Sequence, residues 1–110
     1  MLTIDGTKIS LTRGDSALLI FGAVDSSGQE YVLKEGDTIT FTVKESPADT
    51  AAKIKKISST WQIQLEPEDT KPLKFKKYFY DVQLTTTYND HQWIETIIEK
   101  AIFKVGEEIG

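Results

Sequence analysis

The sequence lacks several features that mark common classes of protein. It contains no cysteine, so disulfides and thiolate zinc sites are excluded. Its apolar runs are all shorter than the ~20 residues that cross a bilayer, and its first residues show neither the basic start nor the apolar run of a signal peptide. We therefore expect a protein that does not contact a membrane and is released into the cytoplasm of the producing cell.

Linkers, internal repeats and low-complexity tracts are absent as well, and helical periodicity is weak throughout. The length of 110 residues suits one domain, since single domains commonly contain ~100–200 residues. The hydrophobic fraction of 39% and the charged fraction of 27% are typical of a globular chain rather than a disordered one. The sequence thus predicts a single domain over residues 1–110.

The charge balance is slightly acidic, with a net charge of −4 and a pI near 5.0. This argues against a general nucleic-acid binder, because such proteins neutralise phosphates with lysine and arginine. The lysines gather in two runs, at residues 53–56 and 71–77. These are either solvated strand edges, where lysine discourages aggregation, or a phosphate-binding patch. The acidic balance favours strand edges, and we expect no nucleic-acid partner.

Alternation of apolar and polar residues is the main structural signal. It is cleanest over residues 38–44, where Ile39, Phe41 and Val43 face one way and threonines face the other. The apolar run ALLIFGAV at residues 17–24 predicts a fully buried central strand. About seven short strands separated by turns predict an all-β fold, an immunoglobulin-like antiparallel β-sandwich.

The last strand signal, residues 92–105, carries an irregularity. The residues expected to face inward are first Ile94, Thr96 and Ile98 and then Ala101, Phe103 and Val105. The alternation shifts by one position near Glu99 and Lys100, which predicts a β-bulge. This pattern places Trp93 and Ile97 on the outward face, close to Tyr88 in the preceding turn. Exposed apolar and aromatic residues mark partner surfaces, so Tyr88, Trp93 and Ile97 are the candidate interface residues.

No arrangement of reactive residues predicts an enzyme. The single histidine, His91, lies beside Asp90 in a predicted turn with no nucleophile at a recognisable spacing. Glu66, Glu68 and Asp69 flank a corner, where carboxylates and Thr70 are expected to bond backbone amides. The remaining turn carboxylates match no calcium-binding pattern. We expect no catalytic residue, no metal and no cofactor.

The corner itself resembles the E–F corner of immunoglobulin-type sandwiches. Residues 65–70, LEPEDT, precede Tyr80 and Val82 at the spacing at which a tyrosine bonds back to the corner backbone. Val82 stands where immunoglobulins carry a cysteine, so the topology is shared without the disulfide.

An ordered set of segments resembles a family of small β-sandwich domains in phage tails and baseplates, typified by the N-terminal domain of the baseplate upper protein. The segments are LTRGDSA at residues 11–17, DTITFTVK at 37–44, LEPEDT at 65–70, YFYDVQLT at 78–85 and FKV at 103–105. The resemblance implies a structural protein of the virion that is present in the bacterial cytoplasm before assembly. It also implies docking onto other tail or baseplate proteins, with a homo-oligomer among the options, and no catalytic residues.

The two tryptophans support an alternative, a carbohydrate-binding β-sandwich module. That function requires exposed, roughly coplanar aromatic rings. Trp61 shares the inward phase of Ile63 and Leu65, whereas Trp93 is on the outward phase. Carbohydrate binding therefore requires Trp93 to lie roughly coplanar with other exposed rings, whereas docking onto a protein requires only that Trp93 be exposed at the contact surface.

Overall fold

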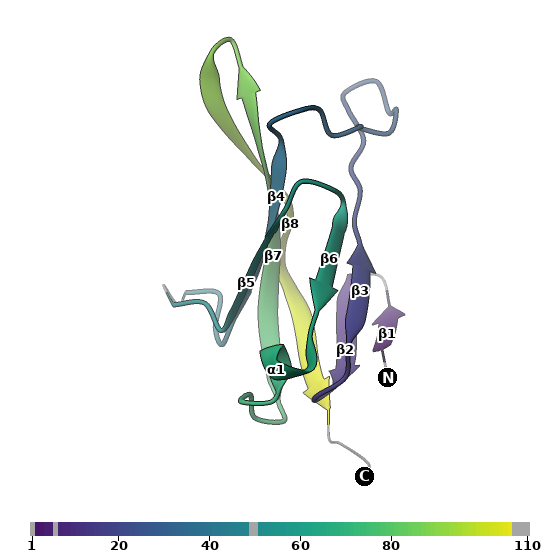
Figure 1. Cartoon of the computed structure of the whole chain (residues 1–110), viewed down its shortest axis with the longest axis vertical. Helices are drawn as coiled ribbons and strands as arrows, with labels where there is room; N and C mark the ends of the chain where they lie inside the picture. Colours follow the sequence, from purple (N-terminus) through teal and green to yellow (C-terminus); the bar gives the residue numbers. More distant parts are fainter. Residues whose placement is uncertain (1, 6, 49–50, 107–110) are drawn as a thin grey trace.

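The computed structural model describes residues 2–5, 7–48 and 51–106, which form eight strands and one short helix (Figure 1). In chain order they are β1 (Leu2–Asp5), β2 (Lys8–Thr12), β3 (Ala17–Ile20), β4 (Thr38–Lys44), β5 (Ile54–Ser58), β6 (Gln62–Leu65), α1 (Pro67–Thr70), β7 (Lys77–Tyr88) and β8 (His91–Gly106). No helix in this described part of the chain is long and apolar enough to cross a membrane. The all-β prediction is confirmed.

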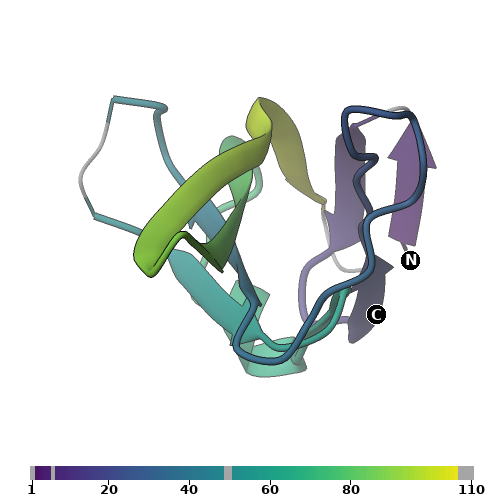
Figure 2. The ribbon, with the colours of Figure 1, turned by 90° about the horizontal axis from the view of Figure 1, so that it is seen from above.

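The strands form two sheets. Six of them pair in the order β1-β2-β8-β7-β4-β5, and β3 pairs with β6 in a separate sheet of two strands. Figure 2 shows the larger sheet curling around the smaller one, which gives the predicted sandwich. The neighbours β4, β7 and β8 correspond to the C, F and G strands of an immunoglobulin sandwich, and β3 and β6 correspond to B and E. All pairs are antiparallel except β2 with β8, which is parallel.

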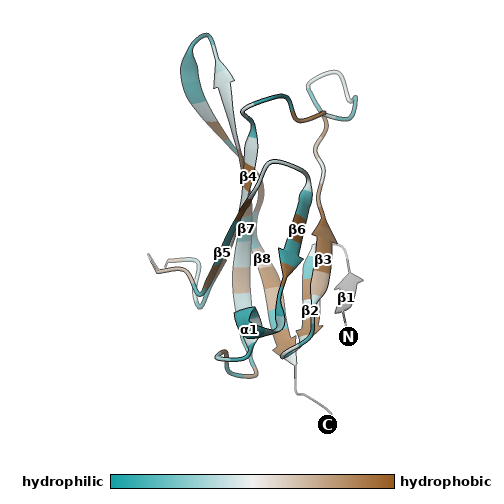
Figure 3. Cartoon of the chain, viewed as in Figure 1, coloured by the Kyte–Doolittle hydropathy of each residue, from teal (hydrophilic) through white to brown (hydrophobic). Residues whose placement is uncertain are grey.

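The core lies between the two sheets and centres on aromatic rings. Phe41 of β4 packs 5.5 Å from Tyr80 of β7 and 6.1 Å from Phe103 of β8, centroid to centroid. Phe21 adds a stacked contact with Phe41 at 5.9 Å. The predicted alternation of β4 is confirmed, since Ile39, Phe41 and Val43 are fully buried. Figure 3 shows apolar colour along β3 and the lower part of β8, with α1 hydrophilic.

The prediction of a fully buried strand over residues 17–24 was wrong. Regular structure ends at Ile20, and the side chains alternate, with Leu18 51% and Ile20 68% exposed. The physical reason is that β3 belongs to a sheet of only two strands, and only one face of that sheet meets the core. After Ile20 the chain runs as a long loop to β4 at one end of the molecule (Figure 1).

The corner around α1 forms as predicted, but with a different tyrosine. The Asp69 carboxylate accepts a hydrogen bond from the Glu66 amide at 2.7 Å, and the Thr70 hydroxyl accepts one from the Gly14 amide at 2.8 Å. The Tyr78 hydroxyl bonds both the amide and the carbonyl of Lys74, at 3.0 and 3.2 Å. Tyr80 instead donates to the carbonyl of Thr7. Tyr80 lies two residues, or ~7 Å, further along β7 than Tyr78, so it lies beyond the corner.

Candidate functional site

The β7–β8 hairpin extends beyond the rest of the sheet. The first residue of β4, Thr38, pairs with Thr85, so the residues of β7 after Thr85 have only β8 as a neighbour. The two strands are joined by Asn89 and Asp90, whose φ angles of 50° and 64° are those of a type I′ turn. This confirms the predicted turn at residues 88–91, and Figure 1 shows the hairpin standing at the end of the molecule opposite α1.

The predicted bulge in β8 is confirmed. Tyr80 pairs with Ala101 and Val82 with Ile98, so β8 carries an extra residue opposite Asp81. Lys100 takes a left-handed conformation, with φ at 52°, and its amide donates to the Asp81 carboxylate at 2.8 Å. Ala101, Phe103 and Val105 are buried, as predicted.

A second bulge follows immediately, and the sequence did not reveal it. Val82 pairs with Ile98 but Gln83 pairs with Thr96, which leaves Ile97 as a further extra residue. Each bulge moves all later side chains to the opposite face. The expected inward positions of Ile94 and Thr96 were therefore wrong, and both residues are exposed. The outward positions expected for Trp93 and Ile97 were also wrong, because both face inward with Leu84 and Thr86.

These inward residues line a groove between the hairpin and the loop that follows β3. We call it the hairpin groove; its volume is about 320 Å³. The loop contributes one wall and the hairpin the other, with the lining residues Ala23, Val24, Asp25, Ser26, Tyr31, Leu84, Thr86, Trp93, Glu95 and Ile97. A second depression adjoins it and shares Ala23, Val24 and Ile97, with Glu30 at its side. The groove is thus apolar along its floor and carries carboxylates at its edges.

Two of the three candidate interface residues line the hairpin groove directly. Trp93 is 50% exposed, and its indole N–H donates to the Glu95 carboxylate at 2.7 Å. Ile97 is half-buried and packs against the core. Tyr88, 63% exposed, contacts the Trp93 ring edge-on, with centroids 6.0 Å apart and planes at 60°. The structure therefore brings the three residues to one end of the molecule.

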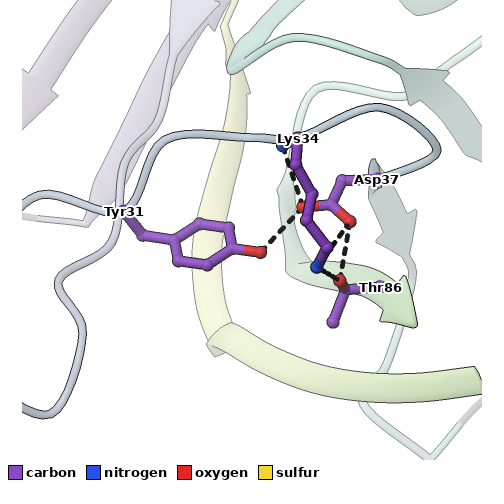
Figure 4. Close-up of polar contacts among 4 residues, drawn as sticks. All are labelled: Tyr31, Lys34, Asp37 and Thr86. Carbon is purple, nitrogen blue, oxygen red and sulfur yellow. Dashed lines mark hydrogen bonds and ion pairs between the residues drawn. The ribbon is translucent and has the colours of Figure 1, made fainter. Parts of the chain in front are cut away.

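A buried carboxylate, Asp37, fixes the loop against the hairpin (Figure 4). It accepts hydrogen bonds from the Tyr31 hydroxyl at 2.7 Å, the Thr86 hydroxyl at 2.6 Å and the Lys34 amide at 3.1 Å. The Lys34 ammonium lies 3.5 Å away. Burial alone would raise the pKa of Asp37, but these bonds and the lysine charge outweigh it and hold the pKa below 3.8. We call these four residues the Asp37 clamp.

Asp25 organises the other part of the loop wall. Its carboxylate accepts bonds from the Ser27 hydroxyl at 2.6 Å, the Ser27 amide at 2.9 Å and the Gln29 amide at 3.1 Å. The Ser27 hydroxyl bond, followed by the Gln29 amide, lowers the pKa of Asp25. The predicted turn at residues 25–28 is confirmed, with Gly28 at a φ of 84°. A negative charge is thereby held at the rim of the hairpin groove.

The opposite end of the molecule collects the lysines. Lys76 and Lys53 pair with Glu45, Lys53 at 4.0 Å, so the two lysine runs meet around one carboxylate. The hydrogen bond and charge of Lys76, with the charges of Lys53 and Lys74, lower the pKa of Glu45. Lys56 pairs with Asp69 of α1 at 3.0 Å.

Metal-ligating side chains do not gather within residues 2–5, 7–48 and 51–106. Nowhere in that part do three histidine, aspartate or glutamate side chains converge in a way that could hold an ion. His91 is exposed at the hairpin tip, and Asp37 and Asp69 are taken up by the structural bonds described above. Asp49, another turn carboxylate, lies outside the described residues.

Comparison of the sequence with protein-family models gives no match, and comparison with curated protein sequences gives none either. The hairpin groove, with its exposed tryptophan, apolar floor and acidic edges, is therefore the feature from which a function has to be argued.

Proposed function

We propose that this protein is a non-enzymatic structural module that binds another protein through the hairpin groove. The observation that carries the proposal is Trp93, a large aromatic side chain left half-exposed over an apolar floor. Buried tryptophans at the centre of an interface commonly supply much of its binding energy. The Asp37 clamp and the Asp25 turn hold the facing wall in place, which reduces the ordering cost of binding.

The setting we propose is a phage or prophage tail or baseplate, with other tail proteins as partners. This part of the proposal rests on the resemblance of the ordered segments from residue 11 to residue 105. Those segments comprise the whole of β4 and α1, much of β7 and shorter parts of β2 and β8.

Particle composition tests this proposal. Phage particles assembled with the wild-type chain are expected to contain it at a fixed ratio to the other tail proteins, measured by quantitative mass spectrometry. Trp93→Ala should lower its incorporation about tenfold or more, as for loss of a central interface anchor. Ile94→Ala is the matched control, because Ile94 is the next residue of β8, is 56% exposed and faces away from the groove. Absence of the wild-type chain from intact particles would refute the tail assignment.

Carbohydrate binding is the second candidate, favoured because Trp93 lines the same groove as the carboxylates of Asp25 and Glu95. The ring arrangement supports it less well than protein binding. Trp93 and Tyr88 are inclined by 60° and form no flat platform. Trp61 is half-buried, and its indole donates to the Tyr31 carbonyl at 3.1 Å. A tryptophan fluorescence titration with cell-wall and capsular glycans distinguishes the two, since only sugar stacking on Trp93 would change the signal and be lost in Trp93→Ala.

A further inference from the structure

We infer that the hairpin groove binds residues 71–77, the segment that follows α1, of a second copy of this chain, so that copies associate head to tail. The inference rests on the proposed function and specifies its partner. Three observations lead to it: the separation of charge along the molecule, an exposed aromatic residue among lysines at the corner, and the apolar, acid-edged groove at the other end.

The charges of the described residues are divided between the two ends of the long axis, which measures 50 Å (Figure 1). The hairpin end, residues 21–38 and 84–96, carries six carboxylates and one lysine, a net charge of −5: Asp25, Glu30, Glu35, Asp37, Asp90 and Glu95 against Lys34. The corner end comprises residues 13–16, 44–48, 51–56, 66–79 and 103–106. It carries ten cations and five carboxylates, a net charge of +5: Arg13, Lys44, Lys53, Lys55, Lys56, Lys71, Lys74, Lys76, Lys77 and Lys104 against Asp15, Glu45, Glu66, Glu68 and Asp69.

The corner end presents an aromatic residue in the middle of its lysines. Phe75 is 48% exposed, and the Arg13 guanidinium lies 4.4 Å from its ring centroid. Lys71, Lys74 and Lys77 are exposed around it. The conformation of this segment is fixed because Leu73 is buried and the Tyr78 hydroxyl forms hydrogen bonds with both the amide and the carbonyl of Lys74. We call residues 71–77 the basic corner.

The hairpin groove is complementary to the basic corner. Its apolar residues Tyr31, Leu84 and Ile97 suit an aromatic ring. Asp25 and Glu95 also line it, and Glu30 lines the adjoining depression. Among the described residues, no lysine or arginine lines it. Opposite potentials favour contact between unlike ends, whereas two hairpin ends or two corner ends repel one another. A two-fold dimer through the groove is therefore disfavoured.

A head-to-tail contact uses a different surface on each copy, so a pair of molecules still has one free groove, on one copy, and one free corner, on the other. Such heterologous contacts generate rings when the rotation between copies closes, and filaments when it does not. Association should also weaken as salt is added, because the charges lie at the protein surface.

Sedimentation velocity of paired charge-reversal variants tests the inference. The groove-reversed chain carries Glu30→Lys with Glu95→Lys, and the corner-reversed chain carries Lys71→Glu with Lys74→Glu. The wild type should form species larger than a monomer as concentration rises at low salt. Each reversed chain should associate at least about tenfold more weakly. An equimolar mixture of the two should regain association and form at least a one-to-one dimer, because one intact groove meets one intact corner.

A matched control separates the surface from the overall charge. Lys8→Glu reverses one lysine at an exposed residue away from both ends and should associate like the wild type, whereas Lys71→Glu alone makes the same charge change at the basic corner and should weaken association. Circular dichroism checks that each variant is folded. The inference is overturned if the wild type stays monomeric at the highest attainable concentration, if Lys8→Glu abolishes association as well, or if the mixture of reversed chains remains monomeric.

Sedimentation and particle composition together distinguish failure of the head-to-tail contact from failure of the proposed function. A monomeric wild type that is still incorporated into particles in a Trp93-dependent way would remove the second copy as the partner while leaving the groove as a protein-binding site. Self-association of a chain that is absent from particles would retain the head-to-tail contact and remove the tail assignment.

Discussion

At the scale of single residues, Asp37 determines how the loop wall meets the hairpin. Its carboxylate joins two segments, since Tyr31 and Lys34 lie in the loop and Thr86 lies in β7. The side chain is 1% exposed, so none of these bonds is replaced readily by water. A buried carboxylate is tolerated here because donors surround it and a lysine offsets its charge.

Asp37→Asn should lower the free energy of unfolding by about 2 kcal/mol at neutral pH. The substitution replaces hydrogen bonds to a buried charge with weaker ones, and it places the asparagine NH2 group against other hydrogen-bond donors. The pKa of Asp37 is below 3.8 in the folded protein, so its contribution is present above that ordinary value and is lost as pH falls through the folded pKa. Urea denaturation of both proteins across this range measures the difference. A difference that stays constant into strong acid would contradict the ionised clamp.

The two buried tyrosines of β7 should differ in their effects. Tyr78→Phe removes two hydroxyl hydrogen bonds and Tyr80→Phe removes one, so the two variants should cost roughly 2 and roughly 1 kcal/mol of stability. Only Tyr78 bonds the backbone of Lys74, so only Tyr78→Phe should also weaken self-association. Denaturation and sedimentation on the same samples give the two readouts. Equal weakening by both variants would show that the basic corner does not depend on this bond.

At the scale of elements, the double bulge in β8 decides which side chains enter the hairpin groove. With the single bulge that the sequence predicted, Trp93 would face away from the groove. The extra residue at Ile97 reverses the alternation again and turns Trp93 and Glu95 inward. The left-handed conformation of Lys100 is part of this arrangement, and its amide is held by Asp81.

Lys100→Gly should therefore raise the free energy of unfolding by about 0.5–1 kcal/mol, because glycine adopts a positive φ without the steric cost that a lysine side chain carries. Lys104→Gly is the control in the same strand. Lys104 is exposed and has no positive φ, so glycine there should destabilise by about 0.5–1 kcal/mol. If both variants lose stability equally in urea denaturation, Lys100 is not strained.

The elements that the sequence predicted correctly depend on local signals. Alternation identified β4, the Asn-Asp pair identified the hairpin turn, and the shift of apolar residues near Glu99 identified the first bulge. The second bulge has no such signal, since Ile97 and Ile98 are both apolar and either could face the core. The apolar run of β3 was misread for a similar reason, because the number of partner strands is not encoded within the run itself.

The hairpin groove depends on contacts that no local pattern contains. Asp37 and Thr86 are separated by 49 positions, and the carboxylate was recognised only as a turn residue. Tyr88, Trp93 and Ile97 were identified as one surface, but the loop wall that faces them was not. Only the fold brings residues 23–31 opposite the hairpin.

At the scale of the whole molecule, the net charge of the sequence does not reveal how the charges are distributed between the two ends. The net charge is −4, yet the fold gathers the lysines at one end and leaves the other acidic. The sequence shows two lysine runs without showing whether they lie together, and in the structure they meet around Glu45. Such an arrangement gives the molecule a direction, which suits assembly into an ordered array better than binding to a uniform surface.

The indole NMR signals of the two tryptophans test whether the groove around Trp93 binds the basic corner of a neighbouring copy. The corner-reversed chain, labelled with ¹⁵N, keeps an intact groove, and the unlabelled groove-reversed chain keeps an intact corner. Addition of the second chain should shift the Trp93 signal more than that of Trp61, since Trp61 lies outside the groove lining and touches it only through its bond to the Tyr31 carbonyl. An unchanged Trp93 signal at saturating partner would contradict the account.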